Sequence, residues 1–233
     1  ILQRDSTPSE PETRVAELQR IAILPFENVG PPDEAYLADG ITDEIRTRLS
    51  ALSGLAVIGR QSSIQYKDTQ KTAQQIGEEL GADFLLGGTI SIRQGADGAV
   101  RVRVRPQLTK VTDATQRWAE VYDDEVIDAL QLETDIAEKV VEALDITLLE
   151  PERRMIGERP TDNLEAYQYH LRGNDYYQRS ATEEDIRTAV QMFEKAIELD
   201  PDSSIYKLIL ADLSRRAGLA TESLSAIDTV LSD

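Results

Sequence analysis

The 233-residue chain is acidic, with 43 Asp and Glu residues against 25 Lys and Arg residues and a formal net charge of −18. That charge repels a nucleic-acid backbone, whose binding needs clustered cations, and argues against a DNA- or RNA-binding role. The chain has no cysteine and a single histidine, His170, which excludes disulfides, thiolate chemistry and sites built from several histidines. No apolar run reaches transmembrane length, so we expect a soluble fragment whose membrane anchor lies outside it.

Residues 1–18 are rich in Pro, Ser, Thr and Glu without a sustained apolar period, which predicts a flexible tether. The apolar run 21–26 then predicts a buried strand. A helix over 33–52 follows, because apolar residues recur every four positions on one face: Leu37, Ile41, Ile45 and Leu49.

Gly40 interrupts this helical pattern and allows two interpretations. Either the helix restarts with Thr42 as its N-cap, or the glycine lets another backbone approach closely.

Further strands are predicted at 55–58, 83–93, 99–111 and 117–122, with turn chemistry over 94–98 that suits an antiparallel hairpin. Helices are predicted over 72–80, stopped by Gly81, and from Leu132 to Leu144. Together these elements give an α+β or α/β domain over residues 19–148, with a mixed five-stranded sheet and about three helices.

Residues 149–162 are charged and flanked by proline, as in a linker or short connecting helix, and 163–233 are predicted to be all helix. Large and small residues alternate there in the order typical of a tetratricopeptide unit. The positions are Tyr169, Gly173, Tyr176, Ala189, Phe193, Ala196 and Pro201. A second, degenerate unit follows, so we expect one clear repeat and one degenerate or truncated repeat.

Five stretches carry a resemblance to a known family: Leu24–Asn28, Ala38–Glu44, Val57–Ser63, Leu80–Asp83 and Trp118–Asp123. In this order they resemble the TolB amino-terminal-like domain of bacterial signalling proteins, which is related to flagellar and curli accessory domains. The resemblance covers residues 20–145 and continues through 160–167 into the repeats. In that family the domain commonly follows a membrane helix, with an adenylate cyclase, a Ser/Thr kinase or a winged-helix domain on the cytoplasmic side. The resemblance implies an extracytoplasmic input or assembly region that lacks those output domains.

Acidic residues gather at Asp39, Asp43 and Glu44, where paired carboxylates could perform acid/base chemistry or bind a hard cation. The favoured interpretation is a helix start whose acids stabilise its positive end. The acidic run 123–125 is similarly expected to lead into a helix rather than to bind Ca²⁺. We therefore predict no catalytic residues, no metal site and no cofactor.

A ligand site is the alternative for the carboxyl end of the second strand, because open α/β sheets often bind ligands there. Its candidate residues are Asp39, Gly40, Arg60, Ser62 and Ser63. The alternating residues Arg101, Arg103 and Arg105 could receive an anion, but a solvated sheet face balanced by carboxylates is the commoner arrangement.

Four tyrosines of the first repeat helix, Tyr167, Tyr169, Tyr176 and Tyr177, are candidates for partner binding, although most are expected to be core or groove residues. His170 on the same helix is expected to be a packed or exposed residue rather than a pH switch.

These features predict a non-enzymatic sensory or scaffolding region of a membrane-associated bacterial protein. It would contact a protein partner or self-associate, for example as a homodimer, and would touch the membrane only through a segment outside the chain. The alternative is a small-molecule sensor that uses the cleft near Asp39, Arg60 and Ser62.

Overall fold

A computed structural model describes residues 18–94, 100–125, 129–179 and 182–217. The predicted tether, the centre of the hairpin turn and the end of the second repeat lie outside these ranges. Within them the chain has a mixed α/β architecture followed by a helical segment, as the sequence predicts.

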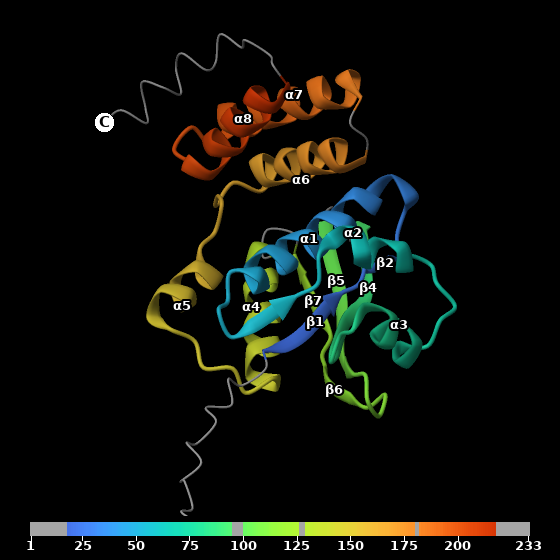
Figure 1. Ribbon diagram of the computed structural model, residues 1–233. Coiled ribbons are helices and arrows are strands. Elements are labelled where there is room, and N and C mark those ends of the chain that lie inside the picture. Colours follow the sequence, from blue (N-terminus) through green and yellow to red (C-terminus); the bar gives the residue numbers. More distant parts are fainter. Residues whose placement is uncertain (1–17, 95–99, 126–128, 180–181, 218–233) are drawn as a thin grey trace, which may run out of the picture.

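The sheet has seven strands, and its main path runs in the order β3-β1-β4-β5-β6 (Figure 1). The strands on that path are β1 (Gln19–Ile23), β3 (Leu55–Val57), β4 (Phe84–Gln94), β5 (Val100–Lys110) and β6 (Gln116–Ala119). β1 is parallel to β3 and β4, whereas β4 and β5 form the predicted antiparallel hairpin.

The prediction of five strands is wrong by two. A short β2 (Glu27–Asn28) pairs with β4, and the single strand expected over 117–122 is two strands, β6 and β7 (Tyr122–Glu125). Because β5 has 11 residues, it pairs with β6 near one end and with β7 near the other. The acidic residues 123–125 therefore belong to a strand and not to a helix-leading turn.

Helices cover both faces of the sheet. α1 (Ala35–Ser50) and α4 (Ala129–Ala143) share the main core with alternate residues of the central strands, including Ile21 and Ile23 of β1. α3 (Ala73–Leu80) packs on the opposite face, where Ala22 belongs to a separate small core. The predicted stop of α3 at Gly81 is confirmed, because Gly81 adopts the left-handed conformation after the helix; at its start, Thr72 forms a capping box with Gln75.

The predicted linker contains the connecting helix α5 (Glu150–Gly157), whose Ile156 is completely buried in the main core. Three longer helices follow, α6 (Leu164–Arg179), α7 (Glu183–Leu199) and α8 (Ser204–Ala217). In Figure 1, α6 lies between α1 and the α7–α8 pair. We call residues 19–143 the α/β segment and residues 164–217 the helical segment.

Small residues allow close packing in the helical segment. A Cβ atom at Gly173 would lie 2.9 Å from the ring of Phe193, and Ala166, Ala196 and Tyr206 form a fully buried cluster. These contacts have the small-against-large character that the repeat pattern predicts, while the assignment to tetratricopeptide repeats stays a prediction.

α1 runs through Gly40 without a break, so the interpretation with Thr42 as an N-cap is wrong. The Thr42 hydroxyl instead donates to the carbonyl of Ala38 at 2.7 Å and accepts from the backbone N–H of Phe26 at 3.3 Å. Gly40 does permit a close approach, but by the side chain of Leu171 on α6: an added Cβ would lie 2.9 Å from Leu171 Cδ2. The glycine thus sets how closely the two segments pack.

We expect Gly40→Val to destabilise the chain by about 1–3 kcal/mol, because the added methyl groups would overpack the contact with Leu171. Urea unfolding followed by circular dichroism measures this change. Gly59→Val is the matched control, since no atom lies within 4 Å of a Cβ built there. In a Leu171→Ala background the same substitution at Gly40 should cost less; an undiminished cost would show that Leu171 is not the obstacle.

Candidate functional site at the junction of the two segments

The acidic residues Asp39, Asp43 and Glu44 lie well inside α1, which begins at Ala35. The prediction that they stabilise the start of a helix is therefore wrong. Each carboxylate instead has a cationic or histidine partner, and most of these partners come from other elements. These three residues provide the acidic side chains of α1 at the junction of the two segments.

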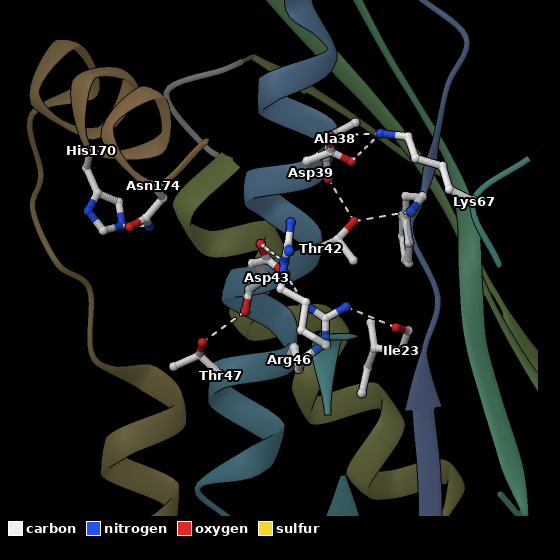
Figure 2. Close-up of polar contacts among 12 residues, drawn as sticks. Ile23, Ala38, Asp39, Thr42, Asp43, Arg46, Thr47, Lys67, His170 and Asn174 are labelled. Atoms are coloured by element: carbon white, nitrogen blue, oxygen red, sulfur yellow. Dashed lines mark hydrogen bonds and ion pairs between the residues drawn. The ribbon is translucent and has the colours of Figure 1, made fainter. Parts of the chain in front are cut away.

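Two of the acids hold the segment that follows β3. Lys67 donates to both carboxylate oxygens of Asp39, at 2.9 and 3.0 Å. The Nε of Arg60, in the short helix α2 (Arg60–Ser63), donates to both oxygens of Asp43 at 3.0 and 3.2 Å. Arg46 also contacts Asp43 and donates to the carbonyl of Ile23 on β1 at 3.0 Å (Figure 2). These contacts fix α1 to α2 and to β1.

The third acid reaches the helical segment. A carboxylate oxygen of Glu44 lies 3.0 Å from Nε2 of His170, which is also 3.2 Å from the side-chain nitrogen of Asn174. Burial would raise the pKa of Glu44, but the hydrogen bond and charge of His170, with the charge of Arg48, outweigh it and lower that pKa. His170 is 2% exposed and stacks against Tyr206 with ring centroids 5.2 Å apart. It is a packed residue, as expected.

A second carboxyl, Glu133 on α4, is completely buried beneath this contact. The hydroxyl of Tyr167 on α6 donates to one of its oxygens, and Arg48 donates to the other at 3.4 Å. Burial, together with the neighbouring carboxylate of Glu44, raises the pKa of Glu133 to about 8. Arg48 also donates to the carbonyl of Glu158 at 2.9 Å. The buried network therefore joins α1, α4 and α6 to the end of α5.

An open hollow of about 840 Å³ lies beside this network, between α1, the turn after β3, α6 and α7. Its lining includes three arginines, Arg60, Arg172 and Arg179, and two carboxylates, Asp39 and Asp175. Apolar and aromatic groups complete the wall: Pro32, Ala35, Tyr36, Ile64, Tyr176 and Met192. A hollow of this size can hold a small organic ligand.

The structure brings together only part of the predicted ligand site. Asp39 and Arg60 line the hollow. Gly40 is buried under Leu171, Ser63 is fully buried, and Ser62 is exposed outside the lining. Arg172 was missed, because the sequence gives no sign that α6 lies against α1.

The four candidate tyrosines also differ in their exposure, and only one of them lines the hollow. Tyr176 lines the hollow, Tyr177 is 37% exposed, and Tyr169 is partly buried beside the guanidinium of Arg172. Tyr167 is 1% exposed, so the prediction that it faces a partner is wrong for this structure. Its ring belongs to the main core because α6 packs on α1 and α4.

The arginine-rich strand β5 is balanced by carboxylates, as the commoner interpretation predicts. Arg103 forms an ion pair with Asp123 on β7, and the hydrogen bond and charge of Arg103, with the charges of Arg93 and Arg101, lower the pKa of that carboxyl. Among the residues that the structure describes, no group of three or more His, Cys, Asp or Glu side chains could hold a metal ion.

We expect Glu133→Gln to become progressively more stabilising, relative to the wild type, as the pH rises from 5 to 8. The pKa of Glu133 is about 8 when folded and near 4.5 when unfolded. Its contribution to stability is therefore complete below about pH 4.5 and lost as the pH rises through 8, by at most about 1.4 kcal/mol per pH unit. Urea unfolding at several pH values measures this, with the exposed Glu138→Gln on the same helix as control. A constant difference between wild type and Glu133→Gln would contradict the assignment.

We expect the opposite pH dependence for Glu44→Gln. Because the folded pKa of Glu44 is lowered, its carboxylate stabilises the fold above its unfolded pKa of 4.5, and that stability is lost as the pH falls through the folded value. The variant should be less stable than the wild type at pH 7, and the gap should narrow toward pH 3. Urea unfolding at several pH values measures the difference. The exposed Glu142→Gln is the control, and its stability should stay close to that of the wild type at every pH.

No protein-family model matches the chain. "Putative adenylate cyclase 3" of Rhizobium meliloti (strain 1021) is 32% identical over 194 residues, which are 83% of this chain and 32% of the relative. The chain thus spans about a third of the length of this curated relative.

Similar solved structures include TolB from Acinetobacter baumannii, with 17% identity, a TM-score of 0.40, and coverage of 55% of this chain and 28% of that chain. Lipoprotein GNA1162 from Neisseria meningitidis is 14% identical with a TM-score of 0.38, covering 55% of this chain and 98% of the lipoprotein. The carboxy-terminal domain of LpoB from Salmonella enterica is 17% identical with a TM-score of 0.31, covering 45% and 81%.

Proposed function

We propose that this chain is a non-catalytic input or scaffolding region of a bacterial signalling protein, in which the helical segment contacts a protein partner or a second copy. The proposal rests on the close packing of the helical segment against the α/β segment. α6 shares its core with the α/β segment through Tyr167 and Leu171, and a buried polar network ties the same helix to α1 and α4. A force or contact applied to the helices would therefore reach the sheet without a flexible joint.

The arrangement of the acidic residues supports a structural rather than a catalytic role. Asp39, Asp43 and Glu44 are each engaged by Lys67, Arg60 or His170. A general acid or base must be free to reach a substrate, whereas these carboxylates join elements of the fold.

The sequence similarity to "Putative adenylate cyclase 3" supports a role in signalling, because 83% of this chain aligns with part of that protein. The aligned third of the relative would be a regulatory region attached to an output domain. The repeats would recruit a partner to it or join two copies.

The resemblance of residues 20–145 to the TolB amino-terminal-like domain supports an extracytoplasmic location, since such domains commonly follow a membrane helix. Membrane attachment would then come from a segment outside this chain. Within the described ranges, no helix combines the length and the apolar character needed to cross a membrane.

Two exposed apolar side chains of the helical segment are candidates for the contact surface. Tyr177 on α6 is 37% exposed and Leu208 on α8 is 53% exposed. Large exposed side chains of this kind are typical anchors of protein interfaces. Val121, which is 60% exposed between β6 and β7, provides a matched apolar position on the α/β segment.

We expect the Tyr177→Ala and Leu208→Ala variants to weaken association about tenfold or more, because truncating an interface anchor typically costs at least about 1–2 kcal/mol. Sedimentation velocity over a concentration series measures self-association, and cross-linking of the intact parent protein in its own cells measures partner contact. Val121→Ala should change neither.

Association that is unchanged by both variants in both measurements would contradict the assignment of this surface. Saturable turnover of a substrate by the chain itself, abolished by one point substitution, would contradict the non-catalytic role.

A further inference from the structure

We propose that the hollow between α1, α2, α6 and α7 is a binding site for a small organic anion, either a phosphate monoester or a carboxylate attached to an apolar group. The site is assembled from both segments, so its ligand would join them. This small ligand is distinct from the protein partner proposed above.

The charge of the hollow contrasts with that of the chain. The lining residues and their ion-pair partners contain four cations: Arg60, Lys67, Arg172 and Arg179. They contain three carboxylates: Asp39, Asp43 and Asp175. A local excess of positive charge in a chain with a net charge of −18 favours an anionic ligand at this place and disfavours one elsewhere.

Two of the arginines have hydrogen-bonding capacity to spare. Arg60 uses Nε to hold Asp43, and its two terminal amino groups form no hydrogen bond with the described residues. Arg172 forms no hydrogen bond or ion pair within the same ranges, although it is exposed at the edge of the hollow. Free guanidinium edges match the paired oxygens of carboxylate and phosphate groups.

Aromatic rings lie against two of the lining arginines, Arg172 and Arg179. Arg172 lies over the ring of Tyr36 at 5.0 Å and near that of Tyr169 at 5.9 Å, and Arg179 lies 5.0 Å over Tyr176. A stacked guanidinium loses less conformational freedom on binding an anion than a free one does.

The rest of the wall sets the chemical class of the ligand. Ile64 is 37% exposed, and it lines the hollow together with Met192 and Pro32. These groups offer an apolar surface beside the arginines, which suits a ligand with a short hydrocarbon or aromatic part. The volume of about 840 Å³ accommodates such a molecule but not a folded partner.

Binding of phenyl phosphate and of benzoate to the full 233-residue chain tests the site by isothermal titration and by the Arg Nε–Hε signals in a ¹H–¹⁵N spectrum. We expect saturable binding of at least one of the two, and tighter binding than that of inorganic phosphate. The preferred anion would distinguish a phosphate ester from a carboxylate ligand.

Arg172→Gln is the decisive variant, because Arg172 is exposed and its replacement leaves every hydrogen bond of the junction in place. It should raise the Kd of the preferred anion tenfold or more. Arg154→Gln, at an exposed arginine on α5 that is not among the residues lining the hollow, should leave the Kd unchanged. Arg60→Gln should weaken binding as well, and its melting temperature shows whether the loss of the contact with Asp43 has disturbed the fold.

Three outcomes would overturn the inference: no saturable binding of either anion, an equal loss of affinity in Arg172→Gln and Arg154→Gln, or tighter binding by a hexaglutamate peptide than by both small anions. None of them bears on the association measurements with Tyr177 and Leu208, so the two proposals can fail separately.

Discussion

The contact between α1 and α6 is the constraint on which the other features of the junction depend. Leu171 of α6 occupies the space that a side chain at Gly40 would fill. This close approach brings Tyr167 and His170 into reach of carboxyls on α4 and α1. Because the two helices lie close together, α6 provides one wall of the proposed anion-binding hollow and α1 provides another. A wider separation of the two helices would remove the core contact, the polar network and the hollow together.

In the buried polar network, the pKa values of two neighbouring carboxyls, Glu133 and Glu44, are shifted in opposite directions. Glu133 is completely enclosed, and burial raises its pKa to about 8, whereas the pKa of Glu44, which keeps 18% of its side chain exposed, is lowered by His170 and Arg48. Two nearby carboxylates would repel one another in a medium of low dielectric constant, so a neutral Glu133 relieves that repulsion. Buried polar groups of this kind contribute little net stability, and they favour a packing that gives their charged groups partners. The network is therefore better suited to fixing the orientation of the helices than to strengthening the fold.

Electrostatic pairing also explains why an acidic chain can present a cationic hollow. The acids of α1 are neutralised by basic residues from neighbouring elements, such as Lys67 and Arg60. Arg172 is added from α6 and has no acidic partner within the described ranges. An anion entering the hollow would meet arginines from both segments. Binding would then stabilise the junction, which links the proposed ligand to the proposed signalling role through one set of contacts.

The sequence by itself determined most of the elements and their order, because local periodicity and turn chemistry act over a few residues. The four-residue spacing from Leu37 to Leu49 predicts α1, and Gly81 predicts the end of α3. The split of the last strand into β6 and β7 was not predictable, since it depends on how β5 pairs along its length. Similarly, the small-against-large order in 163–201 predicts helix packing, as the contact of Gly173 with Phe193 shows.

The site was decided by tertiary structure alone. The sequence singled out Asp39 and Arg60, but it gave Gly40 two wrong or incomplete explanations and included the buried Tyr167 among the candidates for partner binding. Glu133, Arg48 and Arg172 carry no local signal, because their roles arise only when α6 packs on α1. Periodicity reports which face of a helix is buried; which helix covers that face, and which charged groups then meet, depends on contacts between residues more than 80 positions apart.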